Sequence, residues 1–449
     1  MSDVIKIRKG LDIKLSGEAE KQLSEVSSVL VALKPPDFNG VFPKLFVKEG
    51  DPVNAGTPVF FNKYRENIIF TSPVSGTIKE VFRGPKRKML QIVIESDGKM
   101  NYETFGKGDP NDLTREQITE KLLKSGTWAF IRQRPYSIIA NPDDQPKSIF
   151  ISAFDSSPLA PDYGFIVEKN SQAFQTGLNA LAKLTTGKVH LNIHEGEPVS
   201  RIFLDAQNVR INRFSGPHPA GNVGIQIHHL DPINKGEIVW YVNPQAVITI
   251  GKLFTEGIYD ASKIIAITGS ETEKPGYLKV MNGTSIQPLI KGRVKESDVR
   301  YISGNVLTGT KVDPDGYLGF YDNQLTVIPE GNYYEFLGWS MPRFDKFSFS
   351  RTFFSWLTPD KKYKLDTNLN GGHRAFVLTG LYEKVFPMDI YPMQLLKAIM
   401  IKDIDLMEQL GIYEVDEEDF ALCEFIDPSK TEMQAMVREG LELILKEMS

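Results

Sequence analysis

Alternating apolar and polar residues dominate the first hundred positions and predict β-strands. The apolar runs are short and are bounded by Gly, Pro and Asp, which favour turns. Two such runs, at 46–59 and 68–78, have the lengths and boundaries of hairpin strands. Ser96-Asp97-Gly98 then marks the end of this β-rich region. The pattern predicts a small flattened barrel of hairpins within residues 1–100.

The periodicity changes after residue 100. Helical and strand patterns alternate along the next part of the chain, which favours a helix-covered, partly parallel sheet. The predicted elements are helices at 115–124 and 171–184 and strands at 148–153 and 188–193. We therefore expect an α/β domain over residues 101–258.

Two further regions complete the predicted organisation. A strand at 263–267, Pro-Gly turns and a hairpin-like stretch at 317–328 predict a small mixed β domain over 259–330. Residues 331–449 begin with an aromatic-basic segment and become helical after Pro387. The last helix follows Ser429-x-x-Glu432, a pattern typical of a capping box.

Composition and charge exclude several classes of protein. A chain of 449 residues is long enough for several cores. Its 52 Lys+Arg against 57 Asp+Glu give a net charge of −5 without a long basic block, which argues against nucleic acid as a partner. The single cysteine, Cys423, excludes an intrachain disulfide and a self-contained iron–sulfur cluster. The longest apolar stretch, 238–254, is interrupted by Asn243-Pro244, so no membrane span is predicted.

The hairpin region carries the first family resemblance. The run from Phe46 to Val59, followed by Ile68 to Ile78 with its Ser72-Pro73 pair, resembles the biotinyl/lipoyl-domain family. In that family a lysine eight residues before this proline carries the prosthetic group. Arg65 occupies that position here, and a guanidinium cannot serve as the amine nucleophile. We expect no covalently bound group; an acyl or biotin carrier modified at Lys63 is the alternative.

Longer strings carry a second, more specific resemblance. They are Lys9-Gly10-Leu11-Asp12, Arg132 to Ser137, Phe214 to Gly224, Ile227 to Pro232, Asp366 to Gly372 and Tyr382 to Ile390. Together they span nearly the whole chain and closely resemble the NqrA family of the sodium-translocating NADH:quinone oxidoreductase. The order of the parts is also similar to that of the flavin- and NADH-binding subunit of respiratory complex I and, more distantly, to the RnfC family.

These resemblances imply a fold and a role. The fold is multidomain α+β, with a biotinyl/lipoyl-like barrel, a Rossmann-like α/β domain, a β-grasp domain of the soluble-ligand-binding type and a C-terminal helical domain. The role is that of a peripheral subunit on the cytoplasmic face of the bacterial inner membrane, beside the membrane subunit NqrB and the flavin-bearing subunit NqrC. The resemblance also implies quinone, either ubiquinone or menaquinone, bound by this chain or at a site it shapes in the membrane subunit.

The cofactors of the complex I relative are not expected here. In that relative a Ser-Gly pair precedes a glycine-rich loop that cradles the flavin phosphate. Here Ser125-Gly126 precedes the bulky run from Thr127 to Arg132, and Cys423 stands alone where the relative holds an iron–sulfur cluster. We expect no FMN, no iron–sulfur cluster and no catalytic residue in the isolated chain. A purely structural adaptor and a soluble flavin-dependent NADH dehydrogenase are the alternatives.

The loop from Gly216 to Gly221 is one candidate for a quinone or partner interface. Proline fixes φ and glycine permits close approach of a ligand to the backbone. The candidate residues are Pro217, His218, Pro219 and Gly221, with His218 offering a hydrogen bond to a quinone-like carbonyl. The alternative is a tight turn that packs two domains together.

Arg132, Arg134 and Tyr136 form the other candidate group. Arginine forks suit an anion such as phosphate or carboxylate. The alternative is an ion pair between domains, with an aspartate such as Asp155.

A prenyl tail moved from hydrocarbon into water costs about 3–4 kcal/mol per five-carbon unit. Any quinone site is therefore predicted near the membrane partner, with only the headgroup reaching this chain.

The aromatic-basic segment is a candidate docking surface for the membrane partner or its lipid headgroups. Its candidate residues are Phe347, Phe349, Arg351, Phe353, Phe354 and Trp356. Stacking on single-stranded nucleic acid is disfavoured by the net negative charge. An internal core is the other alternative.

Two histidines and the single cysteine are weaker candidates for chemistry. His190 and His194 share one face of a predicted strand, but a metal would require a third ligand such as Glu195 or Glu197. A solvated edge strand explains the pair more simply, so no metal is expected. Cys423 lies among apolar residues, which should raise the pKa of its thiol and leave it inert.

Overall fold

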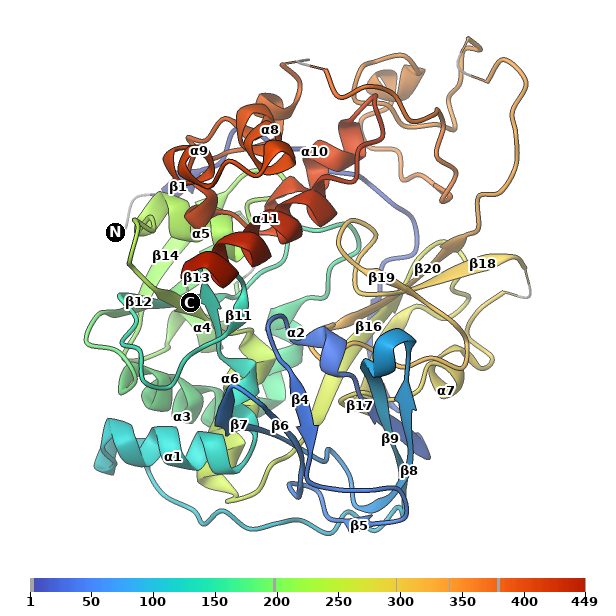
Figure 1. Cartoon of the computed structure of the whole chain (residues 1–449). Helices are drawn as coiled ribbons and strands as arrows, with labels where there is room; N and C mark the ends of the chain where they lie inside the picture. Colours follow the sequence, from blue (N-terminus) through green and yellow to red (C-terminus); the bar gives the residue numbers. More distant parts are fainter. Residues whose placement is uncertain (1–3, 197–198, 296, 339, 378–379, 449) are drawn as a thin grey trace.

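The computed structural model describes residues 4–196, 199–295, 297–338, 340–377 and 380–448. Within these residues the strands form sheets of seven, six, four and three strands, and helices gather at the C-terminal end of the chain (Figure 1). In this part of the chain no helix combines the length and the apolar character needed to cross a bilayer.

The two smaller sheets form the N-terminal barrel. One contains β3 (Leu30–Leu33), β9 (Met89–Ser96), β8 (Gly76–Arg83) and β5 (Pro52–Val53), and the other β4 (Pro43–Leu45), β6 (Pro58–Asn62) and β7 (Arg65–Thr71). Alternation along β6 and β7 buries Phe60 and Phe70, whose rings stack at 4.2 Å. Lys63 and Tyr64 form the exposed turn between these two strands, and Arg65 lies opposite Asn62. The predicted barrel of hairpins is confirmed.

The seven-stranded sheet belongs to the α/β domain. Its order is β1 (Val4–Lys6), β14 (Arg210–Ser215), β13 (Lys188–His194), β12 (Ser148–Ser152), β15 (Val239–Tyr241), β10 (Arg132–Arg134) and β11 (Ile138–Ile139). The first five are parallel, and β10 and β11 are antiparallel additions. The helix-covered, partly parallel sheet predicted from the alternating pattern is therefore confirmed.

Helices cover both faces of this sheet. α3 (Ser171–Ala182) and α6 (Pro244–Thr255) pack closely together on one face, and α1 (Arg115–Lys124) lies nearby (Figure 1). α5 (Val223–Leu230) packs on β12 from the other face. Because β12 is covered on both sides, Ile149 and Ile151 join the core beneath α3 and α6, whereas Phe150 packs with Ile227 of α5.

The six-stranded sheet belongs to the mixed β domain. Its order is β19 (Thr310–Val312), β18 (Val299–Ser303), β20 (Gln324–Pro329), β16 (Ser262–Thr268), β17 (Gly276–Met281) and β2 (Glu20–Glu25). The predicted hairpin at 317–328 is wrong. β20 instead pairs with β18 and β16, and residues 317–323 form a loop, because strand partners distant in sequence satisfy its backbone.

Residues 4–25 do not belong to the barrel sheets. β1 pairs in parallel with β14, and β2 pairs in parallel with β17. Leu15, which lies between β1 and β2 in the sequence, forms an isolated β-bridge with Tyr363. The start of the chain is thus incorporated into parts of the molecule that are formed mainly by much later residues.

The helical end packs against the α/β domain. α8 (Pro392–Ile401), α9 (Ile404–Gln409), α10 (Ala421–Ile426) and α11 (Met433–Met448) share a core with Ile7, Phe214 and Ile225. The predicted capping box does not form. The Ser429 hydroxyl donates to the carbonyl of Ala375 at 2.9 Å, and Glu424 accepts from the Gln434 N–H at 2.9 Å, so tertiary partners replace the local cap.

Candidate functional site

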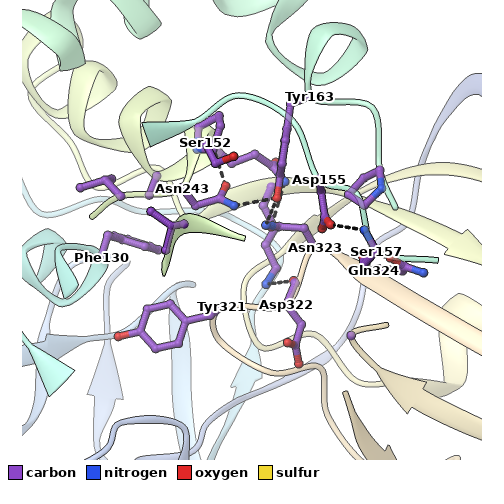
Figure 2. A pocket seen from close by; sticks show the side chains of 18 of the residues that line it. Phe130, Ser152, Asp155, Ser157, Tyr163, Asn243, Tyr321, Asp322, Asn323 and Gln324 are labelled. Atoms are coloured by element: carbon purple, nitrogen blue, oxygen red, sulfur yellow. Dashed lines mark hydrogen bonds between the residues drawn. The ribbon is translucent and has the colours of Figure 1, made fainter. Parts of the chain in front are cut away.

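A cavity of about 250 Å³ opens at the carboxyl ends of β12 and β15. From β12 the chain proceeds outward through β13 and β14 and then returns to the other side of β12 as β15. The two strands are thus the point where the strand order reverses, which is where open α/β sheets bind ligands. The loop before β20 in the mixed β domain forms the opposite wall. Lining residues from both sides are Ser152, Asp155, Asn243, Tyr321, Asp322 and Asn323 (Figure 2).

Side-chain amides and one phenol form a polar wall of this cavity. Asn243 caps α6 and donates to the Tyr163 hydroxyl at 2.7 Å, and Asn323 lies 3.4 Å from the same oxygen (Figure 2). Gln245 donates to Asn323 Oδ1 at 2.9 Å and to the carbonyl of Ile264 at 2.7 Å. Burial raises the pKa of Tyr163, so its hydroxyl stays protonated. These bonds fix the polar groups before a ligand arrives.

Arg132 brings a positive charge to an aromatic part of the cavity. Its guanidinium lies 5.0 Å from the ring centre of Tyr241 and 4.8 Å from that of Tyr321. Nη2 also donates to Ser137 Oγ at 2.6 Å. Two rings and one hydroxyl thus hold the cation, and neither ring neutralises it.

His218 is held by both its backbone and its ring. Its N–H donates to Asp12 Oδ1 at 2.9 Å, and its carbonyl accepts from the Leu11 N–H at 2.8 Å. Nδ1 lies 3.0 Å from Ser156 Oγ, which also accepts from the Gly221 N–H at 2.8 Å. The loop is therefore fixed by the N-terminal segment and by the residues that follow β12.

The ring of His218 is a neutral group with one nitrogen unoccupied. Burial lowers its pKa to about 4, so it carries no charge near neutral pH. Because Ser156 Oγ already accepts from Gly221, its hydroxyl hydrogen can donate to Nδ1, which favours the tautomer with the hydrogen on Nε2. Nε2 has no hydrogen-bond partner among the described residues, and His218 lines the cavity. The arrangement offers a neutral donor to a ligand.

Lys263 fixes the loop that carries Tyr321. Its Nζ donates to the carbonyls of Gly319, Phe320 and Asp322 at 3.1, 3.2 and 2.8 Å. Burial lowers the pKa of this lysine to about 7, with Asp322 acting in the opposite direction. The lysine thus shapes the cavity through the backbone of its wall.

Arg134 lies in a different environment, which we call the acidic nest and define as Arg134 with Asp416, Glu418 and Asp419. The arginine is fully buried and lies 2.7 Å from both Glu418 Oε1 and Asp419 Oδ2, and 3.8 Å from Asp416 Oδ2. Although burial opposes it, Arg134 together with Arg438 lowers the pKa of Asp416. The nest joins β10 to the helical end.

Comparison with known proteins identifies the family. The chain matches the NqrA N-terminal barrel-sandwich hybrid domain at residues 5–97, the NqrA second alpha/beta domain at 113–259 and the NQRA C-terminal domain at 264–313. It is 41% identical to the NqrA subunit of the Na(+)-translocating NADH-quinone reductase of Rhodopirellula baltica, over 99% of this chain and 98% of that protein. The corresponding subunit of Yersinia pestis is 40% identical, over 99% and 100%. The chain belongs to the NqrA family.

Membership of the NqrA family confirms the resemblance seen in the sequence. The family matches also confirm a multidomain protein with an N-terminal barrel-sandwich domain and a second α/β domain. One solved structure with partial overlap is an NAD+-reducing NiFe hydrogenase, which is 10% identical with a TM-score of 0.40 over 76% of this chain and 62% of that one. An overlap this low carries no argument about chemistry.

The structure separates the predicted quinone or partner residues of this NqrA family member into two groups. Arg132, His218 and Gly221 line the cavity. Tyr136 instead packs on the helical end, where its ring lies 6.2 Å from that of Tyr413. Outside the cavity lining are Arg134, Tyr136, Pro217 and Pro219. The sequence alternative of an interdomain ion pair describes Arg134 correctly, but Asp155 is not its partner, because the acids of the helical end lie closer.

The predicted docking residues also divide by exposure. Phe347 and Phe349 are partly buried against the helical core, and Phe353 and Phe354 are half-buried. Arg351 and Trp356 are exposed, with the guanidinium 5.9 Å from the indole centre. The partly buried phenylalanines thus anchor the segment on the body of the protein, whereas Arg351 and Trp356 face solvent.

The bulky run after Gly126 fills the core of the α/β domain. Trp128 is fully buried, contacts Trp240 edge-on at 5.4 Å and donates from Nε1 to the carbonyl of Ala140 at 2.7 Å.

Cys423 is buried, and burial raises the pKa of its thiol, as predicted.

The histidines of β13 correct one interpretation. β13 lies between β12 and β14, so the predicted edge strand is wrong. His190 is buried and stacks on Phe150 at 4.6 Å, and burial lowers its pKa to about 4. Glu195 pairs with Arg213, and Glu197 lies outside the described residues. Among the described residues no group of three or more His, Cys, Asp and Glu could hold a metal ion.

Several cavity residues were not found from the sequence. Asn243 was noticed only as a break in an apolar stretch, yet it lies two residues after the end of β15 and lines the cavity. Its position after a buried strand was the available signal. Lys263 and Tyr321 come from the mixed β domain, and no local pattern connects them with β12 or β15. Tertiary packing alone brings these residues together.

Proposed function

We propose that this chain works as the extrinsic NqrA subunit of a sodium-pumping NADH:quinone oxidoreductase, on the cytoplasmic face of the inner membrane. Membership of the family supports this role, because relatives with that name match over nearly their whole length. NADH oxidation and the electron-carrying cofactors then lie on other subunits. The membrane subunit NqrB and the flavin-bearing subunit NqrC are the proposed neighbours.

We further propose that the cavity between β12 and β15 contributes to the quinone site. Its position at the reversal of the strand order is the observation that carries this assignment. A quinone headgroup is a flat ring with carbonyl acceptors. His218 Nε2 can donate to one carbonyl, and the Arg132 cation beside Tyr241 can stabilise the negative charge that reduction places on an oxygen.

The size of the cavity favours headgroup binding alone. A volume of about 250 Å³ holds one ring and leaves no room for a long prenyl tail. Each five-carbon unit left in water costs about 3–4 kcal/mol, so the tail belongs in the membrane or its embedded subunit. The cavity mouth should therefore face NqrB, and the exposed part of the aromatic-basic segment should lie on the membrane side.

The finer description of the domains is part of the proposal. Parallel strands joined through helices on both faces support the name Rossmann-like for the α/β domain, and the six-stranded sheet supports the name β-grasp for the mixed β domain. We propose boundaries near residues 100, 258 and 330. β1 and β2 lie in sheets of the later domains.

Substitution of the two cavity donors in the assembled complex tests the quinone site. Arg132→Leu should raise KM for a short-tail quinone roughly tenfold to hundredfold, because a hydrogen bond to a charged group contributes about 1.5–3 kcal/mol. His218→Gln removes a neutral donor and should raise KM about twofold to tenfold, because such a hydrogen bond contributes about 0.5–1.5 kcal/mol. NADH oxidation with an artificial acceptor should stay unchanged. Arg213→Leu is the matched control, since Arg213 pairs with Glu195 away from the cavity.

The same experiment separates the two alternatives. A structural adaptor without a ligand predicts an unchanged KM in both variants and normal assembly, which would contradict the cavity assignment. A flavin-dependent dehydrogenase predicts that the purified chain alone oxidises NADH and carries a yellow chromophore. Either result would replace the proposed function.

A further inference from the structure

Residues 331–375 differ in composition from the rest of the chain. They hold seven Lys and Arg against four Asp and Glu, although the whole chain has a net charge of −5. In its described residues, 331–338 and 340–375, the segment is mostly irregular and projects from the body near the helical end (Figure 1). Its composition is therefore a local feature that calls for its own explanation.

The segment exposes large apolar side chains that a soluble surface rarely shows together. Tyr334 and Phe336 are exposed by 106% and 88%. We call seven of the exposed side chains the interfacial surface and define it as Tyr334, Phe336, Leu337, Met341, Phe344, Trp356 and Leu357. It combines aromatic and aliphatic side chains, which is the mixture found at membrane–water interfaces.

The acidic side chains of this segment are already paired. Glu335 lies 2.7 Å from Lys346, and Asp345 pairs with Arg343. Asp360 lies 3.1 Å from Lys14, and Asp366 accepts from the Tyr333 hydroxyl. Glu335 and Asp345 are thus neutralised within the segment and Asp360 by a lysine outside it. Lys362 and Lys364 in turn pair with Glu18 and Glu271, which also lie outside it.

Two cations beside the interfacial surface lack a carboxylate partner among the described residues. The Arg351 guanidinium lies 5.9 Å from the ring centre of Trp356, and Lys361 donates to the carbonyl of Phe344 at 2.6 Å. Both line a groove of about 240 Å³ together with Trp356 and Lys14. Arginine and lysine in a groove suit a phosphate oxygen, and Trp356 at its border suits the region just below a headgroup.

The surface is held in place by its partly buried neighbours. Phe347 and Phe349 pack against the helical core, and the ring of Phe347 lies 5.9 Å from that of Tyr363. The backbone of Tyr363 in turn pairs with Leu15 near the start of the chain. The exposed side chains therefore belong to an anchored surface rather than to a free tail.

We propose that the interfacial surface rests on the lipid bilayer, with the groove of Arg351 and Lys361 receiving an anionic phospholipid headgroup. The two cations that line the groove and the apolar character of the exposed side chains both favour this occupant. The proposal deepens the proposed function, since it rests on attachment of the chain to a membrane complex. It adds that the lipid itself, beside the partner subunits, holds this chain in its orientation.

Binding of the purified full-length chain to vesicles tests the proposal without the other subunits. The chain should float with vesicles of three parts phosphatidylcholine to one part phosphatidylglycerol, bind pure phosphatidylcholine more weakly, and be released by high salt. Phe336→Ser combined with Trp356→Ser should weaken binding at least roughly tenfold. Arg351→Gln and Lys361→Gln should each weaken it about fivefold. Far-ultraviolet circular dichroism and the unfolding midpoint show that the variants fold.

Matched substitutions on the barrel provide the control. Phe42 and Tyr64 are exposed by 55% and 67%, so Phe42→Ser with Tyr64→Ser removes similar area elsewhere and should leave vesicle binding unchanged. Equal loss in this control would contradict the proposal, as would no flotation with anionic vesicles at low salt. Displacement by inorganic phosphate at constant ionic strength would indicate a free-phosphate site instead. If the variants of the interfacial surface bound vesicles normally but failed to assemble into the complex, the surface would contact a partner protein, and the proposal would be contradicted.

Vesicle binding and the quinone site can fail independently. The flotation measurement needs no quinone and no electron transfer, whereas the KM measurement needs no isolated chain. A normal flotation result with an unchanged quinone KM would leave the bilayer contact standing and remove the cavity assignment. The reverse pair of results would remove only the bilayer contact.

Discussion

Arg132 and Arg134 are two residues apart on β10, yet they lie in contrasting regions. Arg134 is enclosed by the carboxylates of the acidic nest, whereas Arg132 is held between the rings of Tyr241 and Tyr321 beside an open cavity. In the nest, charge is matched inside the protein. At the cavity, the cation lies between two rings beside open volume.

The contrast shows why residue type alone does not identify a binding residue. Both arginines follow the same alternation and face the same side of the strand. Partners supplied by distant segments decide their roles, since the helical end delivers the acids and the mixed β domain delivers Tyr321. Arg134 forms ion pairs with the carboxylates of the nest and so holds domains together. Arg132 is influenced by the charges of Asp416 and Glu418 but forms no ion pair among the described residues, and it lies beside open volume that can receive a ligand.

The strongest test of this comparison is Arg134→Met. Removing one partner of a buried ion pair leaves carboxylates uncompensated, so the free energy of unfolding should fall by about 3–5 kcal/mol. Urea denaturation of the full-length chain measures the change. Arg213→Met removes a half-exposed pair with Glu195 and should cost about 0–1 kcal/mol. Equal effects of the two substitutions would mean that the nest does not stabilise the joint.

Arg132→Leu should have a smaller effect on stability. The substitution removes contacts with two rings, so we expect a loss of about 1–2 kcal/mol in the free energy of unfolding. The same denaturation experiment applies. A loss as large as that of Arg134→Met would erase the distinction between the two regions, because Arg132 would then be structural in the same sense.

His218 predicts a pH dependence of stability at the cavity. Its folded pKa of about 4 lies below the unfolded value of about 6.5, so the unfolded chain binds more protons between these limits. Stability contributed by neutral His218 should therefore fall as the pH decreases from 7 towards 4, by about 1 kcal/mol at pH 5.5. His218→Gln should show a shallower decline in urea midpoints. His190 has a similarly lowered pKa and remains in both proteins, so an identical decline would contradict the burial of His218.

The smallest expected effect is at the barrel hairpin. Lys63 is exposed in the turn before β7, so Lys63→Gln should change the free energy of unfolding by less than about 0.5 kcal/mol. Mass spectrometry of the peptide that contains Lys63, taken from the protein in its native source, should show no added mass. An added mass that Lys63→Gln removes would revive the carrier alternative.

Local periodicity correctly predicted those elements whose tertiary contacts agree with the local sequence pattern. The helix at 115–124 is an example, because α1 has a Thr114 cap, the Thr114–Gln117 capping box and an apolar face of Ile118 and Leu122. The predictions at 317–328 and Ser429 failed where a distant segment supplied a better partner, β18 and β16 in the first case and Ala375 in the second. The edge-strand interpretation of His190 failed in the same way, since Phe150 covers the ring.

The candidate site followed the same rule. His218 and Arg132 could be selected because rigid loops and arginine pairs are visible in sequence, and both line the cavity. Asn323 and Tyr321 could not be selected, because they reach the cavity from the mixed β domain. When a site lies between domains, the sequence identifies only those site residues whose role is visible within a single segment.

The placement of β1 and β2 has a consequence for how the protein is made. β1 cannot complete its pairing until Arg213 to Ser215 have been synthesised, and β2 must wait for β17 at Gly276–Met281. Because translation adds about 5–20 residues per second, β1 and β2 remain unpaired for roughly ten seconds to a minute after they have been synthesised. The barrel can fold in that interval, while the leading segment has to be shielded from premature contacts.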